Sequence, residues 1–186
     1  MRRPPNPVTA QQLENVALHY LERFASSSGN LKRVLMRRVQ RAAAAHGGDA
    51  REGERLVDAL VQRYLDARLL DDRAYAAQQA ARLRRSGRSR HAIRGKLAQK
   101  RVQGALIDET IEALDAAPGE DELAAACALV RRRRLGPCRA ETTRAAHAQK
   151  DMAVLARAGF PLGLARRVLA ARDADALDAL TRGEER

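Results

Sequence analysis

The sequence has few aromatic residues, and this scarcity limits the kind of core that the chain can build. Its 186 residues include no Trp, two Phe and three Tyr. Hydrophobic residues still make up 45% of the chain, mostly as Ala, Leu and Val. Because these side chains bury little area each, we expect several thin helical cores rather than one thick core. A helical unit of roughly 50 residues gains little stability from its own core, so it depends on its neighbours.

Cysteines are scarce and long apolar runs are missing. Cys127 and Cys138 form no CxxC pattern and have no His at ligand spacing, so we expect ordinary thiols. No stretch approaches the roughly 18 consecutive apolar residues of a membrane span. The basic residues at 1–5 are not followed by an apolar run, so we expect no signal peptide. We therefore expect a cytoplasmic location without membrane contact.

The sequence also lacks recognisable catalytic motifs. It contains neither GxGxxG nor a phosphate-loop Lys motif, and its four His residues are scattered. Asp71 and Asp72 could form a catalytic carboxylate pair, but adjacent acids are typical of a helix N-cap and first turn. We expect no enzyme, no cofactor and no metal. A hydrolase that uses Asp71 and Asp72 is the alternative.

Apolar residues recur at helical spacing throughout, and no segment alternates as a strand would. At the start of the chain, Thr9 with Gln12 predicts a capping box, and Asn30 and Asp49 predict two further caps. Three apolar stripes follow, so we expect three helices over residues 9–67. The stripes are Leu13, Val16, Ala17, Tyr20, Leu21 and Phe24; Leu31, Val34, Leu35, Val39 and Ala42; and Leu56, Val57, Leu60, Val61, Tyr64 and Leu65.

This pattern of three helices recurs twice more, at a period of about 50 residues. Asp71–Asp72 and Ser89 predict helix starts in the second group, and Glu120–Asp121 predicts one in the third. Lys100–Arg101–Val102 and Ala158–Gly159–Phe160 each place an apolar residue in a turn four residues before the next stripe. We therefore predict an all-α fold of three tandem three-helix repeats. The predicted repeats span 9–69, 70–117 and 118–172, followed by a mixed acidic and basic tail at 173–186 with a short helix at 173–182.

Positive charge is the strongest single signal. The net charge is +12, from 35 Lys and Arg against 23 Asp and Glu. Residues 73–107 hold ten cations and no acid, residues 23–48 hold six and no acid, and Arg131–Arg134 form a third run. Such charge suits nucleic acid, an anionic membrane or an acidic protein. Three basic runs in three successive modules favour a polyanion over faces that are merely solvated.

We expect these cations to contact phosphates rather than bases. No helix combines Asn, Gln and Arg as a base-reading helix would, and Tyr75 is the only aromatic residue near the central run. Arg90, Arg94 and Arg101 are expected to share a helix face. The acidic segments 115–122 and 173–185 are expected to be solvated, to face basic patches on a partner, or to limit association with DNA. The candidate binding residues are Lys32, Arg37, Arg38, Arg82, Arg85, Arg88, Arg90, Arg94, Lys96, Lys100, Arg101, Arg131, Arg132, Arg133 and Arg134.

The order of these signals resembles the RecX family, whose members regulate the RecA recombinase. The central signature carries most of the resemblance: Leu70–Asp71–Asp72, Tyr75–Ala76, Arg82, Ser86–Gly87–Arg88–Ser89, Ile93, Leu97, Lys100 and Val102. Residues 17–23 resemble the opening of the family's first repeat, and residues 157–169 resemble its last helix. The resemblance covers about residues 10–170. Two departures are a longer Ala- and Gly-rich segment at 42–52 and Arg101 where Gly is common.

The resemblance implies three tandem three-helix repeats in a curved, elongated body. It also implies binding to RecA and the RecA–DNA filament. Separately, we expect a monomer that contacts DNA phosphates without sequence preference. Filament growth, ATPase activity and strand exchange would then be inhibited, which modulates recombination and DNA repair. The alternative is a stand-alone basic nucleic-acid-binding module that has no recombinase partner.

Overall fold

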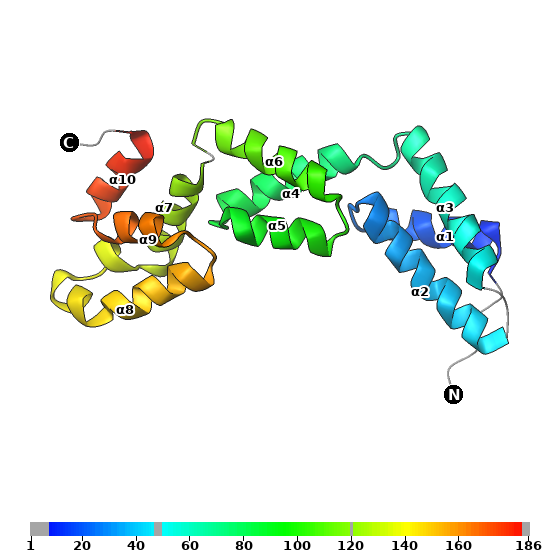
Figure 1. The fold of residues 1–186 in the computed structure, drawn as a ribbon, viewed down its shortest axis with the longest axis horizontal. Helices are drawn as coiled ribbons and strands as arrows, with labels where there is room; N and C mark the ends of the chain where they lie inside the picture. The colour runs from blue at the N-terminus through cyan, green and yellow to red at the C-terminus, as the bar shows by residue number, and fades with distance from the viewer. Residues whose placement is uncertain (1–7, 47–49, 120, 184–186) are drawn as a thin grey trace. The chain divides into compact units, whose positions relative to one another are not determined.

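A computed structural model describes residues 8–46, 50–119 and 121–183. In these ranges the chain forms ten α-helices, one short 3-10 helix and no strand, which confirms the all-α prediction (Figure 1). The elements are α1 (Ala10–Leu21), α2 (Ser28–His46), α3 (Ala50–Asp66), α4 (Asp72–Arg85), α5 (Arg90–Gln99), α6 (Gly104–Ala116), α7 (Glu122–Arg133), η1 (Gly136–Cys138), α8 (Glu141–Arg157), α9 (Leu162–Leu169) and α10 (Ala174–Arg182).

The helices pack into two compact units. The first contains α1 to α3, the start of α4 up to Ala76, and the segment Gln99–Gln103. The second contains Ala77–Ala98 and the chain from Gly104 onward. The segment Gln99–Gln103 belongs to the first unit because it lies against the start of α2. The three-repeat division at 69/70 and 117/118 stays a prediction, because this grouping follows packing and not repetition.

In the first unit, α2 packs along α3, and α1 packs against both. The three predicted apolar stripes supply most of the core. Phe24 lies beyond the end of α1 and is 56% exposed, with its ring beside that of Tyr20. Its place in the first stripe is therefore wrong, because the helix ends before the spacing can bring the ring inward. The core residues are Leu13, Ala17, Leu31, Leu35, Val39, Val57, Leu60, Val61, Tyr64 and Leu70.

In the second unit, α7 packs against α9, α10 and η1, and α8 packs against α9 and η1. The short helix predicted at 173–182 is confirmed as α10, and it contributes Leu177, which is fully buried. Small residues line the buried side of α7, as the Ala-rich composition requires. The core residues here are Ala125, Ala126, Cys127, Leu129, Val130, Leu135, Leu155, Phe160, Ala165, Val168 and Leu177.

The helix starts lie where the sequence predicts caps. Thr9, Asp71, Ser89 and Asp121 each accept a hydrogen bond from the backbone N–H three residues later. Each cap satisfies one of the N–H groups that a helix start leaves without an intrahelical partner. Asp71 therefore has the structural role that the sequence favours.

The cap predicted for α2 is wrong by three residues. α2 begins at Ser28, and the Ser27 hydroxyl accepts from the Asn30 N–H at 3.2 Å. Asn30 is buried inside the helix, where its side-chain amide donates to Ser26 and Tyr20. The cap predicted at Asp49 and the helix start at Glu120 lie outside the described residues.

Candidate nucleic-acid interface

Two turns are held by the same set of contacts. The Ser27 hydroxyl caps α2 and donates to the carbonyl of Lys100, and the Ser89 hydroxyl caps α5 and donates to the carbonyl of Ala158 at 2.6 Å. Both serines are fully buried. The two acceptors lie in the segments whose sequence echo suggested repetition. The turns that hold Lys100 and Ser89 are thus fixed by buried hydrogen bonds.

A carboxylate accompanies each serine contact. Asp72, the first residue of α4, accepts from the Ser28 N–H at 2.7 Å. Glu122, the first residue of α7, accepts from the Arg90 N–H at 2.9 Å. Each acid satisfies the backbone at the start of another helix and lies at the positive end of its own helix dipole. Asp72 therefore has a packing role, which the sequence did not predict.

The candidate cations of the first unit divide into paired and unpaired groups. Lys32 on α2 forms ion pairs with Asp58 at 2.6 Å and Glu54 at 3.6 Å, both on α3. The hydrogen bond to Asp58 and the two nearby carboxylates raise the pKa of Lys32. These contacts join two helices, so Lys32 is mainly a structural residue. Arg37 is exposed on α2, whereas Arg38 is half-buried.

Lys100 and Arg101 lie in the turn between α5 and α6, beside the start of α2. Arg101 is exposed and has a positive φ of 59°, which is uncommon for residues other than Gly and occurs mainly in turns. The predicted helix face shared by Arg90, Arg94 and Arg101 is therefore wrong, because α5 ends at Gln99. A Cβ at Gly29 would lie 2.5 Å from the Arg101 carbonyl oxygen, so this turn approaches the α2 backbone closely.

The cations of α4 and α5 also differ in their contacts. Arg82, Arg85 and Arg88 are exposed at the end of α4 and in the turn that follows. Arg90 pairs with Asp115 at 2.6 Å, and Arg94 pairs with Asp108. The pairs tie α5 to α6 and leave each arginine about half exposed. The exposed Lys96 is the remaining candidate on α5.

Sequence reasoning missed Arg84, which organises this region. Its side chain is 1% exposed and pairs with Asp115. It also donates to the Arg88 carbonyl at 3.4 Å. Arg84 lies in a run of cations without acids, so nothing local distinguishes it from its exposed neighbours. Its burial holds the end of α4 and the turn before α5 in one arrangement.

The arginine run of α7 lies against that turn. A Cβ at Gly87 would lie 3.1 Å from the Leu129 backbone nitrogen, and the Arg132 guanidinium donates to the Ser86 carbonyl. Arg132 and Arg133 lie three and four residues after Leu129, so both project on the side of α7 that meets the turn. Arg85 and Arg88 are thus exposed on either side of this turn, and Arg132 and Arg133 are exposed at the end of the helix that the turn meets. We call Arg85, Arg88, Arg132 and Arg133 the α4–α7 basic surface.

The other two arginines of the run lie differently. Arg131 forms an ion pair with Asp178 of α10. Arg134 ends α7 in the left-handed conformation, with φ of 52°, and is exposed.

A curated relative decides the family. The chain is 42% identical to "Regulatory protein RecX" of Myxococcus xanthus (strain DK1622) over 166 residues, which cover 89% of this chain and 88% of the relative. The chain belongs to the RecX family. No protein-family model matches it, and no solved structure matches it. The resemblance read from the central signature is confirmed, and RecX membership places the chain among regulatory proteins rather than enzymes.

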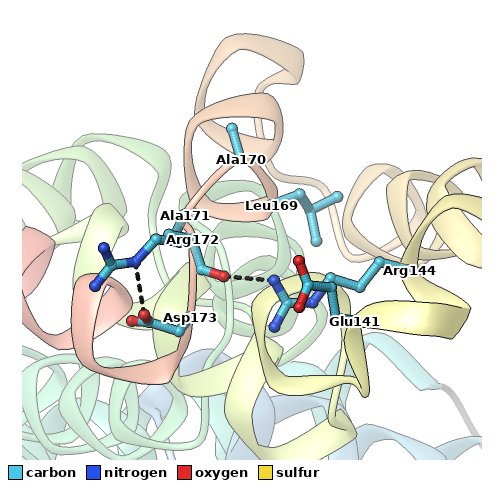
Figure 2. A pocket seen from close by; sticks show the side chains of 7 residues that line it. All are labelled: Glu141, Arg144, Leu169, Ala170, Ala171, Arg172 and Asp173. Atoms are coloured by element: carbon cyan, nitrogen blue, oxygen red, sulfur yellow. Dashed lines mark hydrogen bonds and ion pairs between the residues drawn. The ribbon is translucent and has the colours of Figure 1, made fainter.

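The residues around a hollow of about 540 Å³ in this RecX-family chain make structural contacts rather than forming a reactive site. The hollow is lined by Glu141, Arg144 and residues 169–173 (Figure 2). The Arg144 guanidinium donates to the carbonyls of Arg139, Pro137 and Arg172. Its donors therefore join the segment before α8 to the segment after α9.

The remaining polar groups of the RecX fold are also structural. Asp151 is buried and accepts two hydrogen bonds from Arg139, each of 2.8 Å, and one from the Gly136 N–H. These bonds, with the Arg139 bonds foremost, lower the pKa of Asp151. Burial raises the pKa of the Cys127 thiol to about 11, and both cysteines are free. Across the described ranges, no group of three metal-binding side chains is found, and no helix is long and apolar enough to cross a membrane.

Proposed function

We propose that this RecX-family chain regulates the RecA recombinase by binding RecA and the RecA–DNA filament. Binding inhibits filament growth, ATPase activity and strand exchange, and so modulates recombination and DNA repair in the cytoplasm. The chain acts as a monomer and uses no cofactor. The observation that supports this proposal best is the α4–α7 basic surface, because its four exposed arginines lie in or beside a turn that buried contacts hold in place.

The proposed contact with DNA is made by charge. Arg88 and Arg133 are exposed, and guanidinium groups match phosphate oxygens in a bidentate geometry. Contacts of this kind fix position on a nucleic acid without reading its sequence. Each phosphate neutralised releases counterions, so affinity falls as salt rises. Lys32, Arg90 and Arg94 contribute less, because helix–helix ion pairs already occupy their charges.

We also propose that the three groups of helices are tandem repeats over residues 9–69, 70–117 and 118–172. The support is the recurrence of contacts: Ser27 and Ser89 each bond a turn carbonyl, while Asp72 and Glu122 each bond the N–H that follows those serines. One contact set at two places in the sequence is the pattern expected when each repeat packs on its neighbour.

The test is the ATPase activity of RecA on single-stranded DNA. The protein, added well below one copy per RecA, is expected to lower ATPase activity and strand exchange. A stand-alone nucleic-acid-binding module would instead bind naked DNA tightly at ~150 mM salt, where exposed charges are screened beyond about 8 Å. It would also leave RecA unaffected at this ratio. Unchanged RecA activity would contradict the proposed regulation.

A further inference from the structure

The last helix, α10, begins in the same way as α4 and α7. Asp173 accepts from the N–H three residues later at 2.8 Å, as Asp71 does at 2.8 Å and Asp121 at 2.7 Å. The fourth residue after each cap is buried, and these residues are Tyr75, Ala125 and Leu177. The chain therefore starts a helix of the same design for a third time after α9.

One packing contact of α10 also matches a contact of α7. The turn that precedes α5 lies against the α7 backbone at Gly87, and η1, which precedes α8, packs with α10. α10 packs on α7 through Leu177. The Arg144 guanidinium bonds the carbonyl of Arg172 just before the Asp173 cap (Figure 2). These contacts hold α10 at a defined place on the second unit.

We infer that α10 weakens polyanion binding by holding Arg131 in an ion pair with Asp178. Arg131 is the first cation of the run that continues into Arg132 and Arg133, and its side chain is 44% exposed. While Asp178 pairs with it, Arg131 is not available to a phosphate. This inference rests on the proposed contact between the basic surface and DNA.

The cost of breaking this pair sets the size of the effect. Both partners are partly solvated, and exposed ion pairs contribute at most about 1 kcal/mol, which is about fivefold in an equilibrium constant. Removing the Asp178 charge is therefore expected to tighten binding by up to about fivefold. One extra phosphate contact on a single strand also steepens the dependence of log affinity on log salt by roughly 0.7.

The test measures binding of the full chain to a fluorescent single-stranded oligonucleotide over a salt series. Asp178→Asn is compared with Asp175→Asn, which removes one charge from the exposed side of the same helix. Asp178→Asn is then repeated in an Arg131→Gln background. Circular dichroism of each variant checks that its helix content is kept.

The inference predicts that Asp178→Asn tightens binding and steepens the salt dependence more than Asp175→Asn does. It also predicts that Asp178→Asn has no further effect once Arg131 is replaced. Equal effects of the two asparagine variants would show a general charge effect and overturn the role of the pair. An Asp178→Asn effect that persists in the Arg131→Gln background would overturn it as well. If the unaltered protein bound no oligonucleotide even at low salt, the proposed DNA contact itself would be contradicted, together with this inference.

Discussion

Ser89 donates its hydroxyl proton to the carbonyl oxygen of Ala158, 2.6 Å away, while the same hydroxyl accepts the N–H of Ala92. One buried side chain therefore caps α5 and fastens it to the turn between α8 and α9. Ser27 makes the same two contacts at α2. The exposed Arg101 follows Lys100, and the exposed Arg88 precedes Ser89, so each is next in sequence to one of these hydrogen-bonded residues.

Ser89→Ala is expected to lower the free energy of unfolding by about 2 kcal/mol, since it removes a helix cap and leaves a carbonyl without its partner. Urea denaturation followed by circular dichroism measures this change. Thr142→Ala, an exposed position near the start of α8, is the control and should change stability by less than about 0.5 kcal/mol. Similar values for both variants would mean that the Ser89 bond contributes little.

Two glycines in helices should respond oppositely to alanine. At Gly29 a Cβ would lie 2.5 Å from the Arg101 carbonyl oxygen and 2.8 Å from its Cβ, whereas at Gly95 it would meet no atom within 4 Å. Gly29→Ala should therefore destabilise the protein by about 1–3 kcal/mol, as overpacking does. Gly95→Ala should stabilise it by about 0.5–1 kcal/mol, because α5 loses a flexible residue. Thermal denaturation of both variants measures these changes in stability. An unchanged stability of Gly29→Ala would contradict the close approach of the Arg101 turn to α2.

Arg84→Met should destabilise the second unit, because it leaves the Asp115 carboxylate without its buried partner. Removing one member of a fully buried ion pair costs roughly 3–5 kcal/mol. We expect about 2 kcal/mol here, since Asp115 is 19% exposed and keeps its pair with Arg90. Arg82→Met, at an exposed site on the same helix, is the matched control. If the two variants had equal midpoints in urea, Arg84 would not organise this turn.

Acid should weaken the fold through Asp151. Its pKa in the folded state lies below the ordinary value, first because of the hydrogen bonds from Arg139. A depressed folded pKa contributes stability that is complete above the unfolded pKa of about 3.9 and is lost as pH falls through the folded pKa. The free energy of unfolding should thus decline from pH 5 to pH 2.5. In Asp151→Asn the starting stability should be lower and the decline smaller, and an equal decline in both proteins would exclude this group as the cause.

Local chemistry explains how much of the fold the sequence predicts. Thr9, Asp71, Ser89 and Asp121 were identifiable as caps because a cap bonds its own helix three residues along. The cap of α2 was misplaced because several candidates stand in a row, and tertiary contacts select Ser27 by giving its hydroxyl a distant carbonyl. The contacts of Asp72 and Glu122 were likewise outside the reach of periodicity, since each partner is far away in the sequence.

The candidate surface was predicted less well than the helices. All the basic runs are present, but their charge does not tell which guanidinium is buried, paired or exposed. Arg84 pairs with Asp115, which lies 31 residues later, and Arg94 pairs with Asp108 on the next helix. Arg101 leaves the expected helix face because α5 ends two residues before it. Such distinctions depend on which acids the fold brings near.

Co-sedimentation with assembled RecA–DNA filaments tests the central claim most directly. The variant Arg85→Glu/Arg88→Glu/Arg133→Glu reverses three charges of the α4–α7 basic surface and keeps the Arg132 bond to Ser86. The control Lys150→Glu/Arg157→Glu/Arg166→Glu makes the same change of net charge at exposed positions on α8 and α9. The account predicts that the unaltered protein and the control pellet with filaments while the surface variant, still folded, stays in the supernatant. Equal pelleting of the two triple variants would contradict the claim that this surface binds the filament.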